Sequence, residues 1–244
     1  MRKVIATAAI AAAASVSACS HAQSEDVGPT VSRNYNVGNF NQLELAGHYY
    51  VDIRTGSAVT ISAKGPEKLM DKLVVEVRGD KLLIHPEKER RWWGGHSNWK
   101  SRDKVQVVVT VPSLSAATLA GSGGIRIDKV QGDKFDGQIA GSGDMNVGSI
   151  DVGILKLGIA GSGSVTGGAG KAKSAEYDIA GSGDVNAGGV AVEALKVSIA
   201  GSGGIKANAS GTADVDIMGS GDVEVTGGAK CTTRKAGSGS VRCS

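Results

Sequence analysis

Residues 120–147 read AGSGGIRIDKVQGDKFDGQIAGSGDMNV, a stretch that opens and closes on the same Ala-Gly-Ser-Gly signature. The Gly-Ser-Gly core of this signature occurs seven times, at intervals of 20, 20, 20, 20, 18 and 18 residues. The seven copies begin at Gly121, Gly141, Gly161, Gly181, Gly201, Gly219 and Gly237. A period near 20 residues is typical of solenoid proteins, in which each repeat forms one coil and stacks on the next.

Between the signatures, every second residue is apolar. Ile125 and Ile127 follow one copy, and Leu155, Leu157 and Ile159 precede another. A period of two indicates strands with one buried face, and Gly-Ser-Gly supplies turns that tolerate positive φ. The dense leucine frame of leucine-rich repeats is absent. We therefore predict an all-β fold, a single-stranded β-helix or β-solenoid with coils of about 20 residues.

The composition predicts a narrow interior. Aromatic residues make up only 4% of the chain, whereas glycine reaches 37 of 244 residues. Glycine at this density disfavours helices, at a cost of about 1 kcal/mol for each residue. The core of the solenoid, residues 119–244, must then be filled by Val, Ile, Leu and Ala.

The segment before the signatures, residues 31–118, is also rich in strand patterns but lacks the repeat. Alternating runs such as Tyr50 to Ile53 and Val105 to Val111 predict strands, and residues 66–70 predict one helical turn. We expect an irregular β-rich N-terminal half that is continuous with the solenoid and caps it, because an open coil exposes unpaired strand edges.

The N-terminus has the features of an export signal. Arg2 and Lys3 precede an apolar run that ends at Ala18 and is too short to span a bilayer as a helix. Residues 16–19, Val-Ser-Ala-Cys, resemble the lipobox of bacterial lipoproteins, which implies a signal peptide over 1–18, a lipidated Cys19 and a flexible tether over 19–30. Ser20 follows the cysteine where an inner-membrane signal often has Asp, which favours the outer membrane. The alternative is an ordinary signal peptide and a free periplasmic or secreted protein.

Charge and cysteine content agree with export. Without Arg2 and Lys3 the chain has 25 basic against 24 acidic residues, which argues against nucleic acid as a partner. Once Cys19 carries lipid, Cys231 and Cys243 remain as an even pair in an oxidising compartment. We predict a disulfide between them, with two free thiols as the alternative.

The segment 87–104 contains all three tryptophans and is the main candidate for ligand binding. Trp92, Trp93 and Trp99 lie among basic residues that include Arg91, between two predicted strands. Exposed Trp and Arg side chains stack on sugar rings and seat in membrane interfaces. One alternative is that these indoles cover one end of the solenoid, and another is that the segment is disordered.

No motif points to chemistry, so we predict no catalytic residues, no cofactor and no metal. Asp144, Asp184 and Asp222 follow alternate signatures, and this spacing is typical of charge avoidance along a stack. RTX-type calcium repeats have a period of nine, which this chain lacks. A carbohydrate-active enzyme using the Asp row is the remaining enzymatic hypothesis.

The order of motifs resembles the DUF2807 family. The matching pieces are FNQLELAG from residue 40, VDIRTG from residue 51, GDKLLI from residue 79 and VPSLSAATLAGSGGI from residue 111. The family is described as an autotransporter adhesin head, the GIN domain, and the resemblance implies a β-helix. It implies a non-enzymatic cell-envelope protein that acts as an adhesin-like or structural interaction module, with an envelope glycan, lipid or protein as partner. The alternative function is a periplasmic glycan- or lipid-binding protein that uses the Trp-rich segment.

Overall fold

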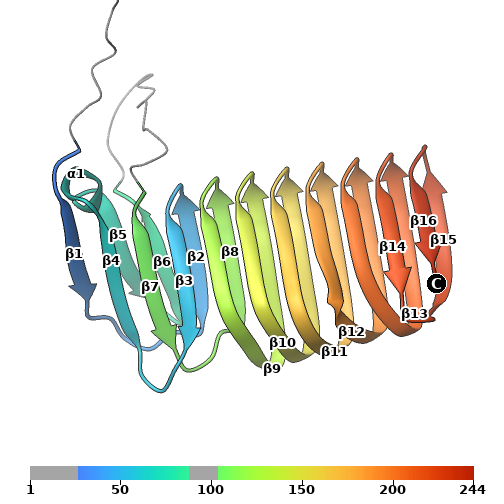
Figure 1. The fold of residues 1–244 in the computed structure, drawn as a ribbon, viewed down its shortest axis with the longest axis horizontal. Coiled ribbons are helices and arrows are strands. Elements are labelled where there is room, and N and C mark those ends of the chain that lie inside the picture. The colour runs from blue at the N-terminus through green and yellow to red at the C-terminus, as the bar shows by residue number, and fades with distance from the viewer. Residues whose placement is uncertain (1–26, 88–103) are drawn as a thin grey trace, which may run out of the picture.

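The computed structural model describes residues 27–87 and 104–244 and shows an elongated β-solenoid whose coils stack along one long axis (Figure 1). The predicted fold class is confirmed. In the described residues, no helix is long and apolar enough to cross a membrane.

Five long parallel strands form the regular part of the solenoid. They are β9 (Gly124–Gly141), β10 (Asp144–Gly161), β11 (Ser164–Gly181), β12 (Asp184–Gly201) and β13 (Gly204–Gly219). In the 20-residue coils each residue lies beside its counterpart 20 positions later, as Met145 lies beside Val165. Two register shifts between β12 and β13, before Ala191 and before Ala194, accommodate the first 18-residue coil.

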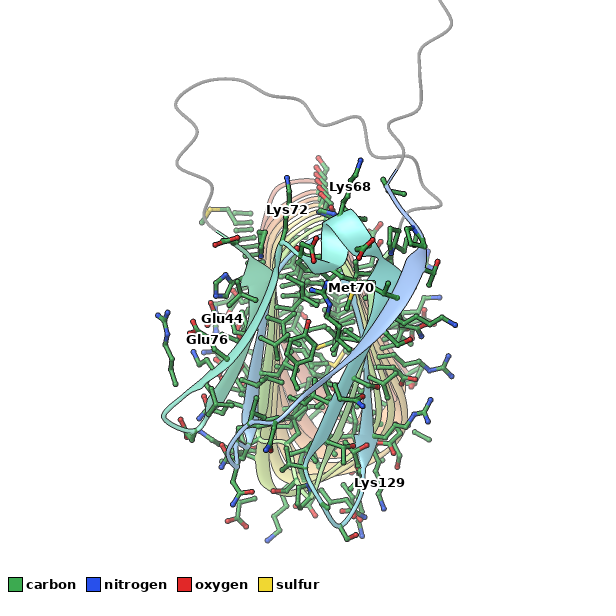
Figure 2. The ribbon with its side chains drawn as sticks, turned by 90° about the vertical axis from the view of Figure 1, so that its left-hand side faces the viewer. Glu44, Lys68, Met70, Lys72, Glu76 and Lys129 are labelled. Atoms are coloured by element: carbon green, nitrogen blue, oxygen red, sulfur yellow. A yellow bond between two sulfur atoms is a disulfide. The ribbon has the colours of Figure 1, made fainter. Side chains whose placement is uncertain are left out.

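Each long strand bends, so that the solenoid has two faces around a common interior (Figure 2). The first part of β9 pairs with β3 (Tyr50–Thr55), and its last part pairs with β8 (Ala116–Gly121). We call the outer surface of the β3 side the first face and the outer surface of the β8 side the second face. Side chains alternate between the interior and these faces.

The Gly-Ser-Gly corners close the coils along one edge, at the arrowheads in Figure 1. Gly141 has a φ of 135°, and a Cβ there would lie 2.3 Å from the carbonyl oxygen of Gly121 in the preceding coil. That same type of carbonyl accepts a hydrogen bond from the next corner, as when the Ser162 N–H donates to Gly141 over 2.9 Å. The first glycine of each signature is therefore required for two reasons, its positive φ and the close stacking of neighbouring coils.

The interior is narrow and apolar, as predicted. In the described part of the chain no polar or charged residue is buried, and one cluster of buried apolar residues runs through the coils. The two interior aromatic rings of the regular coils each sit two positions from a small residue. Phe135 is followed by Gly137, and Tyr177 is preceded by Ala175 on the same inner row. An aromatic ring beside a small residue fills about the same interior volume as the two aliphatic side chains that occupy these positions in other coils.

The solenoid geometry extends further toward the N-terminus than the Gly-Ser-Gly signature predicts. Parallel pairs join β2 (Gln42–Gly47) to β8 and to β6 (Lys81–Pro86), and join β3 to β7 (Gln106–Val111). Gly47 lies beside Gly121, so Gly47-His48-Tyr49 is a corner without the signature. Two coils thus belong to the half that the sequence predicted to be an irregular cap.

The true cap consists of the elements that pair antiparallel. They are β1 (Thr30–Tyr35), β4 (Thr60–Pro66) and β5 (Leu73–Arg78), together with the short helix α1 (Glu67–Met70). The helical turn predicted from the sequence is confirmed as α1, whose Leu69 and Met70 are buried against the core. Figure 2 views this capped end, with Lys68 and Lys72 near the corner edge.

The opposite end is a coil that differs from the others in its inward-facing residues. It is built from β14 (Asp222–Thr226), β15 (Lys230–Ala236) and β16 (Ser240–Cys243). In β15, Thr233 and Lys235 take the positions of the interior residues Val215 and Ile217, and the Lys235 ammonium donates to the Gly239 carbonyl over 2.8 Å. The structure contains a disulfide between Cys231 and Cys243, which links β15 to β16. Inward-pointing charges of this kind discourage strand edges from pairing with other chains.

Candidate functional site

Several residues selected from the sequence lie outside the described residues. They are Cys19, Arg91, Trp92, Trp93 and Trp99. The described ends of the Trp-rich segment are fixed to the body. The Glu87 N–H donates to the Lys72 carbonyl over 2.7 Å, and the Lys104 ammonium lies 4.4 Å from the ring centre of Tyr50 and 3.3 Å from its hydroxyl. These two ends directly follow β6 and closely precede β7.

The Asp row lies on the first face, on the first residue after each corner. Each of its three carboxylates binds the next coil. Asp144 accepts from the Ser164 hydroxyl at 2.6 Å, and Asp184 accepts from the Gly204 N–H at 2.9 Å. Asp222 accepts from both the N–H and the hydroxyl of Ser240, at 3.0 and 2.5 Å. The alternation therefore gives each carboxylate a small neighbour that donates to it, in addition to separating the charges.

These hydrogen bonds have an electrostatic consequence at the last Asp. The hydroxyl and N–H of Ser240 stabilise the ionised carboxylate, so they hold the pKa of Asp222 below its ordinary value. A general acid needs a pKa raised toward neutrality instead. The geometry thus gives Asp222 a structural role in holding the last coil.

On the same face, the residue after each corner and the outward residue two positions later form two rows. Over five consecutive coils we call these rows the polar array, which includes Asp144 and Asp184 but not Asp222. From the cap end, the pairs are Gly124 and Arg126, Asp144 and Asn146, Ser164 and Thr166, Asp184 and Asn186, and Gly204 and Lys206. Within these five coils the order is symmetric about the central Ser and Thr pair, and the rows continue as Tyr50 and Asp52 on the cap side and as Asp222 and Glu224 on the other side.

The glycines at the two ends of the array lie in hollows of the first face. One hollow, of about 290 Å³, contains Gly124 and Arg126 and is bordered by Tyr50 and Asp144. The Tyr50 ring lies against Gly124, where a Cβ would come within 2.9 Å of it. Tyr50 itself is 38% exposed, one of the few exposed large apolar side chains in the described residues.

The second hollow, of about 370 Å³, contains Gly204 and Lys206 and is bordered by Asp184, Asn186 and Asp222. A Cβ at Gly204 would lie 2.7 Å from the Asp184 carboxylate, which accepts from the Gly204 N–H, so the carboxylate would have to shift if a larger residue replaced this glycine. Both hollows are open to solvent, and most of the outward side chains that line them are polar or charged. Such surfaces suit hydrogen bonding to an extended polar ligand better than enclosure of a small apolar one.

The second face carries a ladder of ion pairs. The Glu176 carboxylate binds Lys156 at 2.6 Å in the preceding coil and Lys196 at 3.1 Å in the following coil. Hydrogen bonds to these two ammonium groups lower the pKa of Glu176, and Asp216 is held similarly by Arg234 at 2.6 Å. Since each pair joins neighbouring coils, we assign this face to stability rather than to binding.

No cluster of His, Cys, Asp and Glu suited to a metal ion occurs within the described ranges 27–87 and 104–244. A shallow groove of about 640 Å³ lies at the bend of the coils, with Val152 and Ala172 in its floor and Asp151 and Lys171 on its rim. The Lys171 ammonium and the Asp151 carboxylate, 3.9 Å apart, neutralise each other there. The first face therefore remains the better candidate site.

Sequence reasoning missed two parts of this site. Tyr50 was assigned only to a strand, and the corner at residues 47–49 was not recognised as a repeat. The signal was present, since Leu45-Ala46-Gly47 matches Leu119-Ala120-Gly121 and the two stretches lie in register. The symmetry of the second row was also readable from the sequence once the repeats are aligned.

Comparison with known proteins gives one family and several similar folds. Residues 39–229 match the family DUF2807, "Putative auto-transporter adhesin, head GIN domain". A crystal structure described as a putative adhesin from Bacteroides fragilis has a TM-score of 0.80 at 22% identity, covering 88% of this chain and 97% of that one. One described as a putative lipid binding protein from Parabacteroides distasonis has a TM-score of 0.68 at 23% identity, covering 89% and 97%. Among curated proteins, no sequence matches.

Proposed function

The chain belongs to the DUF2807 family of GIN domains, and from this premise we propose that it is a non-enzymatic, lipid-anchored interaction module of the cell envelope. The observation that carries the proposal is the first face, which offers a continuous row of outward polar side chains over five coils instead of an enclosed site. Solenoids present extended surfaces of this kind to extended partners.

The anchor in this proposal is Cys19, followed by the polar tether over 19–30. Acylation at Cys19 would hold the capped end toward the membrane, because the tether enters the body at β1 in the cap. The body then projects from the membrane with its disulfide-linked coil farthest away. We place the anchor in the outer membrane.

Intact mass of the protein extracted from its native membrane tests the anchor. We expect an N-terminus at Cys19 with added acyl mass, and loss of both membrane fractionation and acyl mass in Cys19→Ala. An unmodified chain that begins near Ser20 or Gln23 would show a free periplasmic or secreted protein and would contradict the anchor.

Capture of envelope material tests the interaction role. The Cys19→Ala protein, immobilised on beads, is expected to retain envelope components of the source cells, and heat-denatured protein on beads is the control. A triple variant, with Trp92, Trp93 and Trp99 changed to Ala, separates the alternative function. Unchanged capture by this variant argues for the first face, whereas lost capture assigns the interaction to the Trp-rich segment. No capture by the native protein contradicts the interaction role.

A further inference from the structure

The polar array has a symmetry that the fold does not require. Its centre is the Ser164 and Thr166 pair, an Asp and Asn pair lies on either side, and a Gly and cation pair ends the array at both hollows. The Asp row is fixed by hydrogen bonds between coils, whereas the second row makes no such bond, so the stacking leaves the second row free to vary. A symmetric outward pattern over five coils therefore points to a ligand that repeats along the same axis.

The second row of the array is also free of structural duties. The side chains of Asn146 and Asn186 and the cations Arg126 and Lys206 make no hydrogen bond or ion pair with other residues among those described. Asn146 and Asn186 are exposed. In contrast, the Asp row is held in place by the coils that it binds. The array thus combines a fixed row of acceptors with a row of unoccupied donors and acceptors.

Charge narrows the class of ligand. The array has two carboxylates, Asp144 and Asp184, and two cations, Arg126 and Lys206, so its net charge is zero. A surface without net charge gives no overall attraction to a polyanion, so an uncharged ligand rich in hydroxyl groups is favoured. Planar carboxylate and amide groups suit adjacent sugar hydroxyls, since each offers two hydrogen-bonding atoms in one plane.

The spacing of the coils restricts the class of ligand further. Coils stack at about 4.8 Å, so the array spans roughly 19 Å between its two glycines. An extended β-1,4-linked glycan advances by one sugar ring over about the same distance as one coil. We propose that the polar array binds a linear, uncharged β-1,4-linked glycan laid along the solenoid axis, with one ring over each coil and rings seated in the two hollows. This inference rests on the proposed interaction role and names its ligand class.

Isothermal titration calorimetry of oligosaccharides with the soluble Cys19→Ala chain tests the proposal. Cellohexaose and chitohexaose are the probes. Maltohexaose is the matched control, because it has the composition of cellohexaose in a curved α-1,4-linked chain, and cellobiose tests length. We expect at least one β-1,4-linked hexamer to bind, at least tenfold more tightly than maltohexaose and cellobiose.

Two variants assign the binding to the array. Asn146→Ala with Asn186→Ala is expected to weaken hexamer binding about thirtyfold, since at least two hydrogen bonds to the ligand are lost. Ser174→Ala with Ser198→Ala, on the second face, is the control and is expected to bind as the native chain does. Circular dichroism spectra and unfolding midpoints equal to those of the native chain verify that both variants are folded.

Failure of both hexamers to bind overturns the glycan proposal, as does equal binding of maltohexaose or undiminished binding by the Asn variant. These outcomes are distinct from failure of the proposed function. If the beads still capture envelope material while neither hexamer binds, the interaction role stands and the ligand class is wrong. If neither beads nor hexamers give binding, both proposals fall.

Discussion

Tyr177 places a polar atom in the otherwise apolar interior of its coil. Its ring is fully buried beside Ala175, and its hydroxyl is the buried side-chain atom in the described residues that lacks a hydrogen-bond partner. Burial raises the pKa of this hydroxyl, so it remains neutral at any physiological pH. An unpaired buried hydroxyl costs free energy because it has lost its hydrogen bonds to water.

Tyr177→Phe is therefore expected to stabilise the protein, by about 1 kcal/mol. The measurement is the free energy of unfolding in urea. Tyr50→Phe, at an exposed ring, serves as the control and should change stability little. A clear loss of stability in Tyr177→Phe would mean that the hydroxyl has a partner.

Gly161 illustrates the opposite case, a residue that the stack fixes completely. Its φ is 134°, and a Cβ would lie 2.3 Å from the Gly141 carbonyl oxygen. Gly161→Ala is expected to cost at least about 1–3 kcal/mol from backbone strain, with the steric clash in addition. Gly38→Ala, where a Cβ meets nothing within 4 Å and φ is not positive, is the matched control. Equal unfolding midpoints for the two variants would contradict the role assigned to the corners.

At the scale of elements, the ion ladder on the second face predicts a pH dependence. The pKa of Glu176 is lowered by Lys156 and Lys196, so its contribution to stability is complete above the ordinary glutamate pKa near 4.5. It is lost as the pH falls below that value, through the lower pKa of the folded state. Because the groups are exposed, we expect an effect below about 1 kcal/mol.

Glu176→Gln isolates this effect. The variant should be less stable than the native chain at pH 7, and the difference in unfolding midpoint should vanish as the pH approaches 3. Glu193→Gln, which removes an exposed carboxylate outside the ladder, is the control. A difference that persists at pH 3 would show that the ladder does not act through its charge.

The elements that the sequence predicted best are those with the closest stacking. Glycine recurs at the corners because a carbonyl of the previous coil leaves no room for a Cβ. This constraint produces the glycine repeat that can be recognised in the sequence. The corner at Gly47 was not predicted, because His48 and Tyr49 stand where the signature has Ser and Gly. A Cβ at Gly47 would also meet no carbonyl of a preceding coil, since its nearest neighbours are side-chain atoms of Pro86 and Tyr49, so the constraint that selects glycine is weaker there.

The polar array was harder to predict for a different reason. Outward positions such as Asn146 and Thr166 are not constrained by packing, so their pattern carries no signal of fold. Their proximity follows only from the register of β10 and β11. The hollows needed the structure as well, because they depend on where the Tyr50 ring and the Asp184 carboxylate lie.

At the scale of the whole molecule, each coil contacts mainly its neighbours, so coils should be interchangeable units. Deletion of residues 144–163 removes one complete 20-residue period and joins Gly143 to Ser164. We expect this shortened chain to fold, with a β-rich circular dichroism spectrum and a cooperative unfolding transition. Deletion of only residues 144–153 joins Ile154 to the Gly143 corner, so that residues of the second face take positions on the first face, and should abolish folding. Failure of the 20-residue deletion to fold would show that the coils are not equivalent.

The disulfide of the terminal coil determines how the far end of the solenoid would respond to force. If tension acts between the tether and the far end, a solenoid yields by peeling, and each 20-residue coil that detaches releases up to about 70 Å of chain. The link between Cys231 and Cys243 closes the outermost coil into a ring, so a pull on the distal end cannot extend residues 231–243. These residues can leave the stack only together, which requires the pairing of β15 with β13 and of β16 with β14 to break in one step.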